Sequence, residues 1–567
     1  MCLHSSSTGK TRILLAILAP RRCSYYYGNM KTRHIQELSP ALVQDLRAKG
    51  ADIERTLALL DLVDAKSVAY LASGSASKAT AVSQTPSIPS AGDPRVFDRT
   101  KLTVLKLPLK AAREAFRALE LPLDFGESSI IEGEDAVFSQ QALTLVGIHL
   151  YPRLAYGVLN GGSATTYIDE KKNRELDGNA FRLFENEFRE TARVSKAAPK
   201  GVTPAFVGMD GNSGPSFLLL KMRSILLRAL EYRIVSGDAK TPVLPFFQMT
   251  SGATDSALAE AYARYRNDPL LSALIQRTGI DPTDAAGAVQ PMLAALSPLS
   301  EGLPRNLFDK AWGTKDTGLA LPGGHGENFR VLADTYRALR AKGVRWAYLG
   351  NVDNSGYTVD PVSLAITALK GADAAFEFSW RTKMDVKGGV LVELPDGTLS
   401  TADIGQAISK EALAVEEAGG KPILFNCATG LFDLDFLVPR LQEIADGLPI
   451  RVSEQDKEAG RYAQAEQNTW EILGLAKSPL IFAVAKESRF VAAKMLMETL
   501  LSSPIGKRME AAPPSERPAP ALMATSADLQ KGFSRLLERE YGFTKKNNGS
   551  YQPISVLEFE STIKKKY

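Results

Sequence analysis

The stretch Leu154-Ala-Tyr-Gly-Val-Leu-Asn-Gly-Gly-Ser163 predicts a buried strand that runs into a glycine-rich loop. Its first six residues, Leu154–Leu159, are apolar or small, which is typical of a strand covered on both faces. The adjacent glycines at 161 and 162 let the backbone bend sharply and approach a ligand, because no Cβ stands in the way. Backbone N–H groups in such a loop suit a phosphate chain. A tight turn without a ligand accounts for the stretch equally well, since it fits neither the P-loop pattern nor the dinucleotide-binding fingerprint.

The overall composition is that of an ordinary globular protein with several domains. The chain has 567 residues, of which 44% are hydrophobic and 23% charged, and its net charge is +4. So small a net charge gives no support to a nucleic-acid or membrane-surface partner. The sequence also has no apolar run of about 18 residues that would form a transmembrane helix.

Cysteine and histidine are scarce. The three cysteines are Cys2, Cys23 and Cys427, and they form no CxxC pattern, so we expect a reducing, cytoplasmic location. Only four histidines occur, which argues against a zinc site built from several histidines.

The N-terminal part divides into three segments. We expect residues 1–30 to be a disordered leader, with Met30 as an alternative start of translation. Residues 31–150 are predicted to be a mainly helical region, including a helix over Lys106–Leu119. Within this region residues 73–97, rich in Ser, Ala, Thr and Pro, have the composition of a linker.

From residue 151 to about 500 the sequence alternates between short strand-like runs and longer helical ones. This alternation predicts an α/β domain whose sheet is mixed but mostly parallel, with flanking helices, in addition to the helical N-terminal region. The predicted strands are Leu154–Leu159, Val243–Met249, Trp346–Gly350, Ala374–Phe378, Gly389–Glu393 and Ile423–Phe425. The predicted helices are Pro215–Arg233, Asp255–Arg266, Glu327–Lys342, Pro361–Leu369 and Asp435–Ala445. Ligands of such sheets bind beyond the carboxyl ends of the strands.

The remaining residues, 501–567, are predicted to be a Pro-rich linker and a short C-terminal region. Residues 511–520 contain four prolines, which is typical of an exposed loop. A helix over Ala527–Tyr541 follows, and the chain ends in a basic segment whose role the sequence does not indicate.

Four further segments contain candidate chemistry. Arg381-Thr-Lys-Met-Asp-Val-Lys-Gly-Gly389 combines three cations with a glycine pair that allows close approach, or is a solvated β-turn. In Leu321-Pro-Gly-Gly-His-Gly-Glu327, glycines surround His325 where a helix begins, which favours an anion, although a glycine-rich turn with an incidental histidine is the simpler interpretation. Asp353 follows the strand at 346–350 and could hold Mg²⁺ shared with substrate phosphates, or could be a turn residue. Lys494 ends an apolar segment and is either a point charge for phosphates or an ordinary helix lysine.

Taken in chain order, these segments resemble the UDP-glucose pyrophosphorylase (UTP–glucose-1-phosphate uridylyltransferase) family. The resemblance rests on eight short matches over residues 154–495. They are Leu159-Asn-Gly-Gly162, Pro199-Lys200, Pro322-Gly-Gly-His-Gly-Glu327, Asn351-Val-Asp-Asn354, Asp385-Val-Lys-Gly-Gly389, Leu424-Phe-Asn426, Gln464-Ala-Glu466 and Arg489-Phe-Val-Ala-Ala-Lys494.

The chain also departs from the family pattern. Ser163-Ala164 replace Leu-Gly in the first loop, and Cys427-Ala-Thr-Gly430 replace much of an Asn-rich segment. About thirty residues, 168–198, separate the loop from Lys200, so Lys171 or Lys172 could serve the triphosphate instead.

The resemblance implies a Rossmann-like nucleotidyltransferase (GT-A-like) fold and the synthesis of UDP-glucose and pyrophosphate from UTP and glucose 1-phosphate, with Mg²⁺ as cofactor. It implies catalytic roles for Lys494 and Lys200 and a metal-binding role for Asp353. The implied nucleotide-binding residues are Leu159, Asn160, Gly161, Gly162, Lys200, Gln290 and Gly324. The implied substrate-binding residues are His325, Asn351, Asp353, Gly388, Gly389 and Asn426.

Two other functions remain open at this point. One is the same chemistry on another sugar 1-phosphate, such as N-acetylglucosamine or galactose 1-phosphate, or on a broad set. The other is a non-catalytic relative that binds nucleotide, which the altered first loop motivates.

Overall fold

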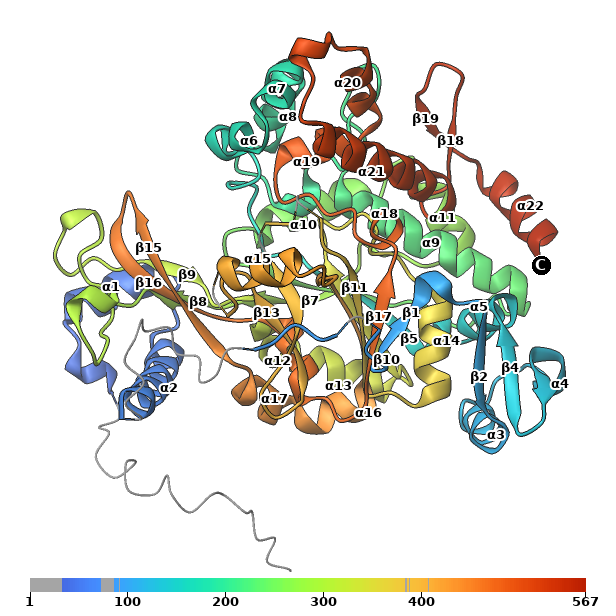
Figure 1. The fold of residues 1–567 in the computed structure, drawn as a ribbon, viewed down its shortest axis with the longest axis horizontal. Helices are drawn as coiled ribbons and strands as arrows, with labels where there is room; N and C mark the ends of the chain where they lie inside the picture. The colour runs from blue at the N-terminus through green and yellow to red at the C-terminus, as the bar shows by residue number, and fades with distance from the viewer. Residues whose placement is uncertain (1–32, 73–85, 91, 383–384, 387, 406) are drawn as a thin grey trace, which may run out of the picture.

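The fold is seen in a computed structural model that describes residues 33–72, 86–90, 92–382, 385–386, 388–405 and 407–567. A long twisted sheet runs through the middle of the molecule and helices cover it on both sides (Figure 1). The predicted leader at 1–30, with Met30, lies outside the described residues, as does most of the predicted linker.

The central sheet has ten strands in the described part of the chain. They are β1 (Val96–Asp98), β5 (Leu154–Leu159), β6 (Phe246–Ser251), β7 (Ala286–Gln290), β10 (Trp346–Asn351), β11 (Ala374–Trp380), β12 (Gly389–Glu393), β13 (Leu399–Asp403), β14 (Leu424–Asp433) and β17 (Pro479–Val484). Along the order β1-β17-β11-β14-β10-β5-β6-β7, only β14 runs antiparallel to its neighbours. The predicted mixed, mostly parallel sheet is therefore confirmed.

Strand β5 lies inside the sheet, and all six of its residues are buried. Leu154, Tyr156 and Val158 face one hydrophobic core, and Ala155 and Leu159 face the other. The split follows from the strand period of two, which sends alternate side chains to opposite faces. An apolar run without alternation is thus what a strand with a core on each side requires.

Each core is closed by its own set of helices. The first contains residues of α5 (Gln140–His149), α9 (Phe217–Ser236), α10 (Asp255–Tyr265), α11 (Ser272–Thr278), α14 (Pro361–Lys370), α15 (Lys410–Ala418), α19 (Leu496–Ser502) and α21 (Pro520–Arg539). The second contains residues of α12 (Asn328–Val331), α13 (Ala333–Ala341), α16 (Leu434–Leu437) and α17 (Leu441–Gly447). The predicted helix at 327–342 is divided between α12 and α13.

The polar segment between the glycine loop and Lys200 folds into three helices, α6 (Glu170–Leu176), α7 (Gly178–Leu183) and α8 (Glu185–Ser195). They project from the body of the molecule beside the C-terminal elements α19 and α20 (Arg508–Ala511) (Figure 1). Ala164 N–H donates to Ala198 O at 3.1 Å, so the two ends of this three-helix segment lie next to each other.

A smaller lobe lies at one end of the sheet (Figure 1). Helices α1 (Pro40–Ala48) and α2 (Ile53–Ala72) pack there against residues of two antiparallel pairs. These pairs are β8 (Met292–Ala294) with β9 (Ala320–Pro322), and β15 (Ile450–Lys457) with β16 (Gly460–Gln467).

The predicted helix over Lys106–Leu119 is wrong in its first part. Val104–Pro108 is strand β2, in a three-stranded sheet with β3 (Ile130–Glu132) and β4 (Asp135–Ser139), and only Leu109–Ala118 is helix α3. Alternating exposed and buried residues along β2 show the strand period, and Pro108 marks the point where the helix begins. The region 31–150 also contains the short helix α4 (Phe125–Ser128), and β1, at the end of the predicted linker 73–97, belongs to the central sheet.

Residues 501–567 belong to the body of the protein. Leu529, Phe533, Tyr541 and Phe559 are buried in the first core. The short helix α18 (Lys486–Arg489) packs against α21, whose first residue is Pro520, earlier than the predicted start. A hairpin of β18 (Phe543–Lys545) and β19 (Tyr551–Pro553) and the helix α22 (Val556–Lys566) end the chain.

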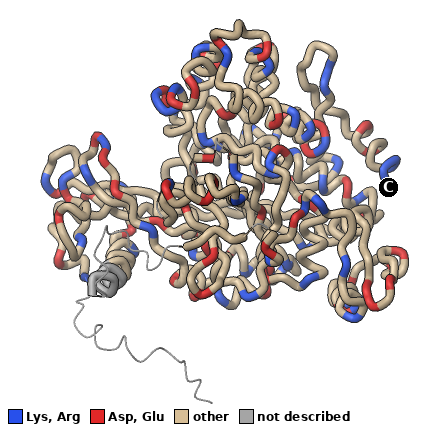
Figure 2. The backbone as a smooth tube through the Cα atoms, viewed as in Figure 1, with Lys and Arg blue, Asp and Glu red and all other residues tan. Residues whose placement is uncertain are grey.

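Positively and negatively charged residues are interspersed along the backbone in the view of Figure 2. Among the described residues, no helix has both the length and the apolar character that a membrane crossing requires.

The contact between α5 and α14 provides a test of the packing. A Cβ placed on Gly147 would lie 1.9 Å from Pro361 O, so Gly147→Ala must push the two helices apart. We expect a loss of about 1–3 kcal/mol in the free energy of unfolding, measured by denaturant titration. Gly178→Ala, on an exposed helix start with nothing within 4 Å of the added Cβ, is the control and should not destabilise the protein. Equal stability of the two variants would contradict the close approach.

Candidate active site

A pocket of about 110 Å³ opens beyond the carboxyl ends of the central strands. Seven of the residues selected from the sequence line it: His325, Asn351, Asp353, Gly388, Gly389, Asn426 and Lys494. Three of them lie at the ends or starts of strands β10, β12 and β14, His325 begins a short 3-10 helix, and the others lie in loops. The pocket therefore lies where ligands of α/β sheets bind.

Asp353 follows directly after β10, in a turn that pairs with the segment before Lys494. Ser355 N–H donates to Val491 O at 2.9 Å, and Ala493 N–H donates to Asp353 O at 3.3 Å. This backbone pairing brings the carboxylate of Asp353 and the ammonium group of Lys494 to the same pocket.

Lys200 does not line this pocket, but it forms an ion pair with Asp353, which does. Its Nζ lies 2.7 Å from Asp353 Oδ2, and the two side chains are only 12% and 14% exposed. The Lys200 backbone N–H donates to Gly162 O at 3.0 Å, which keeps the lysine next to the glycine loop despite the helices between them. Lys171 and Lys172 lie on the exposed face of α6 instead.

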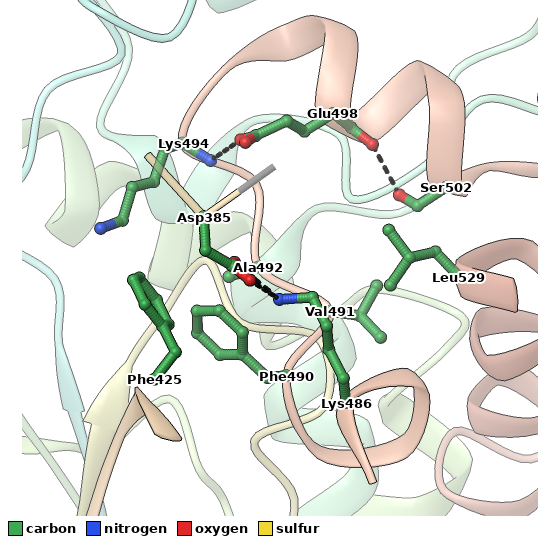
Figure 3. A pocket seen from close by; sticks show the side chains of 10 residues that line it. All are labelled: Asp385, Phe425, Lys486, Phe490, Val491, Ala492, Lys494, Glu498, Ser502 and Leu529. Carbon is green, nitrogen blue, oxygen red and sulfur yellow. Dashed lines mark hydrogen bonds and ion pairs between the residues drawn. The ribbon is translucent and has the colours of Figure 1, made fainter. Parts of the chain in front are cut away.

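Lys494 stands just before α19, and Glu498 fixes its backbone. Glu498 Oε2 accepts the N–H groups of Lys494 and Met495 at 2.6 and 2.8 Å, a capping interaction (Figure 3). Burial raises the pKa of Glu498. On its other side the Lys494 ammonium group lies against Gly388, where an added Cβ would be 3.2 Å from Nζ.

The loop that carries Gly388 is anchored by a second ion pair. Lys486 Nζ lies 2.6 Å from Asp385 Oδ1, and both side chains are largely buried (Figure 3). Asp385 Oδ2 also accepts the Thr382 N–H at 2.8 Å. The ion pair with Lys486 and the bond from the Thr382 N–H therefore fix the position of the Asp385 carboxylate.

His325 is held by the backbone of Thr469. The Thr469 N–H donates to Nδ1 at 3.1 Å, so Nδ1 acts as an acceptor and a neutral ring has its proton on Nε2. Burial lowers the pKa of His325 to about 4, with Lys494 acting in the same direction and Asp403 opposing. At neutral pH His325 is therefore an uncharged donor.

Three of the predicted nucleotide residues form a group beside His325. Gln290 Nε2 donates to Gly324 O at 2.9 Å, and a Cβ on Gly161 would lie 3.2 Å from Gln290 Oε1. Gly324 has φ +89°, and an added Cβ would lie 2.5 Å from Gln467 O, so both its conformation and its surroundings require glycine.

Leu159 and Asn160 lie beneath this group and are buried. The Asn160 side chain donates to Gln248 Oε1 at 3.2 Å, and a Cβ on Gly201 would lie 2.3 Å from Asn160 Oδ1. Their side chains therefore support the loop from below, and only their backbone faces it. Gly162 is exposed and has open space around it.

Several residues near the site were not selected from the sequence. Asp403 and Asn468 line the pocket, and Asn468 Nδ2 donates to Asp403 Oδ2 at 3.0 Å. Arg55, from the N-terminal helix α2, forms a 2.9 Å ion pair with buried Glu327, two residues after His325. The glycine-rich pattern before Glu327 indicated a loop, but nothing in the sequence indicated the partner more than 250 residues away.

The donor set of the pocket suits a hard cation shared with a ligand. The described residues contain no group of three or more His, Cys, Asp or Glu side chains that could hold a metal ion by themselves. Asp353 and Asp403 are the two carboxylates that line the pocket together with Lys494, and Lys200 is paired with Asp353. Mg²⁺ commonly binds to one or two carboxylates plus substrate phosphates. An anionic ligand between Lys200 and Lys494 would complete such a site.

Part of the chain matches one family of known proteins. Residues 306–504 match the family model for UTP–glucose-1-phosphate uridylyltransferase, which confirms the resemblance found from the motifs. A curated Schizosaccharomyces pombe protein, named as a probable UTP–glucose-1-phosphate uridylyltransferase, is 26% identical over 212 residues. The match spans 36% of this chain and 37% of that protein.

Two solved structures are also similar. A UDP-glucose phosphorylase from Trypanosoma brucei matches with 16% identity and a TM-score of 0.48, over 84% of this chain and 80% of that chain. A variant of UDP-glucose pyrophosphorylase from Leishmania major, in complex with UDP-glucose, matches with 17% identity and a TM-score of 0.46, over 82% and 79% of the two chains.

The lowered pKa of His325 predicts how stability depends on pH. The unfolded chain takes up a proton on this histidine near its ordinary pKa of 6.5, whereas the folded protein does so only near 4. Stability due to the neutral ring is therefore present above pH 6.5 and is lost as the pH falls, by up to about 1.4 kcal/mol per pH unit. We expect His325→Gln to lose less stability than the unsubstituted protein between pH 7.5 and 5, measured by denaturant titration. The same loss in both proteins would contradict the assignment.

Proposed function

We propose that this chain, whose residues 306–504 match the UTP–glucose-1-phosphate uridylyltransferase family model, is an enzyme that makes UDP-glucose and pyrophosphate from UTP and glucose 1-phosphate. The observation that supports this most strongly is that Asp353 and Lys494 line one pocket and that Lys200 forms a largely buried ion pair with Asp353. The three residues come from distant parts of the sequence, and together they offer two cations and one carboxylate to a phosphate-rich ligand.

The chemistry of the transfer needs little more than this. A phosphate oxygen of glucose 1-phosphate attacks the α-phosphorus of UTP, the bond to the β-phosphate oxygen breaks, and pyrophosphate leaves. A phosphate monoester is already a nucleophile at neutral pH, so no general base is required. Catalysis of such a transfer consists of alignment and of offsetting negative charge. We assign that work to Lys494, beside Gly388, and to Lys200, next to the glycine loop.

Asp353 is the residue that would hold Mg²⁺. The ion pair with Lys200 keeps its carboxylate at the pocket, where a nucleotide could exchange one partner for another. When bound, Mg²⁺ would neutralise phosphate charge. Lys200, released from Asp353, would then contact the triphosphate.

The nucleotide is proposed to lie along the glycine loop. Gly161 and Gly162 offer backbone contacts, and Gln290 with Gly324 forms the neighbouring wall, which suits the edge of a uracil ring. Leu159 and Asn160 position the loop from beneath.

The sugar phosphate is proposed to occupy the other half of the pocket. His325 presents a neutral N–H to it, and Asn351, Asn426, Gly388 and Gly389 line the space. Asp403, on the same wall, adds a carboxylate suited to sugar hydroxyl groups.

For the same protein we propose a cytoplasmic location, supported by the few cysteines, of which Cys427 is a buried free thiol.

The test of this function is a pyrophosphate-release assay with UTP, Mg²⁺ and a panel of sugar 1-phosphates. We expect release with glucose 1-phosphate, and no release when Mg²⁺ is chelated. Release with N-acetylglucosamine or galactose 1-phosphate, but not with glucose 1-phosphate, would reassign the sugar. Nucleotide binding without release for any sugar would instead establish a non-catalytic nucleotide-binding protein.

Charge-removing variants test the catalytic roles. Asp353→Asn, Lys200→Met and Lys494→Met should each lower kcat by about 10²–10³-fold, because each removes one charge from a preorganised site. Lys172→Met is the matched control on the exposed face of α6 and should retain its activity. A loss of activity in Lys172→Met as large as in Lys200→Met would contradict the choice between these lysines.

Gly162→Ala tests whether phosphates approach the glycine loop. The added Cβ meets nothing within 4 Å in the protein itself, so stability should be unchanged. If the triphosphate lies against this backbone, the KM for UTP should rise about tenfold or more, since a methyl group would hold the phosphates off the N–H groups. An unchanged KM would place the triphosphate elsewhere.

A further inference from the structure

The turn that carries Asp353 buries three of its own carbonyl groups. Asn354, Ser355 and Tyr357, the residues that provide them, are at most 1% exposed. Buried carbonyl groups without partners destabilise a fold, so such a turn depends on donors that reach it from elsewhere. Within the turn, Asn354 O accepts the Tyr357 N–H at 3.0 Å, and Tyr357 O accepts the hydroxyl group of Tyr156, on β5, at 2.7 Å. Two further donors, Lys221 and Tyr541, lie in parts of the chain that the proposed function has not used.

The first of these donors is Lys221, near the start of α9. Its Nζ donates to Asn354 O and, at 2.6 Å, to Tyr357 O. Lys221 is 1% exposed, and among the described residues no carboxylate forms a salt bridge with it. Burial lowers its pKa well below the ordinary value, and Arg489 acts in the same direction, but the charged and the neutral amine both have the two N–H groups that these carbonyls need.

The second donor is Tyr541, just after α21. Its hydroxyl group donates to Ser355 O at 2.6 Å and lies 3.5 Å from Lys221 Nζ. The backbone of Tyr541 is itself fastened to α9, because Arg223 Nε donates to Tyr541 O at 2.7 Å. The tyrosine ring is fully buried.

The opposite side of the turn is tied to the catalytic segments. Asn354 Nδ2 donates to Arg489 O at 3.0 Å, and Ser355 N–H donates to Val491 O. Tyr357 Oη lies 2.7 Å from both Gly157 O and Tyr348 O, on strands β5 and β10, and its one proton is shared between these two carbonyls. The turn is thus held between the sheet, the segment leading to Lys494, and the pair Lys221 and Tyr541.

We propose that Lys221 and Tyr541 are positioning residues that clamp the turn at 354–357 and thereby set the place of Asp353 in the active site. This inference rests on the proposed function of Asp353, and it goes beyond it by making the C-terminal segment part of the catalytic unit. Tyr541 lies outside the matched family segment 306–504, and so does Lys221.

Such a clamp has a clear effect on the reaction. A carboxylate that must exchange Lys200 for a metal ion needs a backbone that does not shift when its partner changes. Loss of the clamp frees the turn to relax, and a displacement of about 1 Å is enough to cost a large factor in rate. Binding of glucose 1-phosphate, which depends on residues across the pocket, is not affected by the clamp.

Tyr541→Phe is the first test, because it removes one hydroxyl group and keeps the buried ring. We expect kcat to fall roughly fivefold, as the loss of one buried hydrogen bond suggests, and the Mg²⁺ concentration for half-maximal activity to rise severalfold. The KM for glucose 1-phosphate should stay the same. Tyr567→Phe is the matched control, since its hydroxyl group also bonds to α9, at Glu231, 3.3 Å away and far along the helix from Lys221. Unchanged kcat and unchanged Mg²⁺ dependence in Tyr541→Phe would overturn the proposal.

Hydrogen exchange separates this proposal from the proposed function. In Tyr541→Phe the amides of residues 355–357 should exchange faster than in the unsubstituted protein, and those of β5 should not. This readout needs no activity, so it tests the clamp even if the protein releases no pyrophosphate in the assay. Lys221→Met should show the same local effect more strongly. If that variant does not fold, Tyr541→Phe alone decides, and unchanged exchange at 355–357 would overturn the clamp.

Discussion

The ion pair between Lys200 Nζ and Asp353 Oδ2, 2.7 Å long and largely buried, is the interaction on which the rest of the site depends. It joins the glycine loop after β5 to the turn after β10, and these two strands are neighbours in the sheet. A buried charge is costly unless it is paired, so each residue holds the other in place until a ligand supplies new partners. The site is therefore formed before a ligand binds, and a magnesium–nucleotide complex would replace the ion pair between Lys200 and Asp353.

The local parts of the fold could be predicted from the sequence. Strand β5 and strand β12 have the predicted bounds, because a short apolar run that ends at glycine or a polar residue is typical of a buried strand. The direction of β14 and its length to Asp433 could not be predicted, since they depend on partners far away in the chain. The predicted helix over Lys106–Leu119 is wrong in its first part, because Pro108 ends strand β2 and marks the point where helix α3 begins.

In the site, too, some residues could be predicted from the sequence and others could not. Motifs identified the residues that line the pocket, since their types and order carry the signal. No motif marks the other residues at the site, because a lysine in an apolar helix or a tyrosine after a long helix looks like any other until the chain folds. These residues are Lys221, Tyr541, Arg55 and Asp403. The N-terminal and C-terminal parts of the chain therefore both support the active site. Arg55 contacts the His325 loop through Glu327, and Tyr541 contacts the turn that carries Asp353. These two parts of the chain lie far from the motifs in the sequence, but in the fold they pack against the site.

The central claim is that Asp353 exchanges Lys200 for a magnesium–nucleotide complex. It is tested most directly by a crystal structure of the protein with Mg²⁺ and a UTP analogue whose bond between the α- and β-phosphates cannot be cleaved. The account predicts that Asp353 contacts the metal ion, that Lys200 contacts the triphosphate, and that their separation exceeds the present 2.7 Å. A nucleotide bound elsewhere, with the Lys200–Asp353 pair intact, would contradict it.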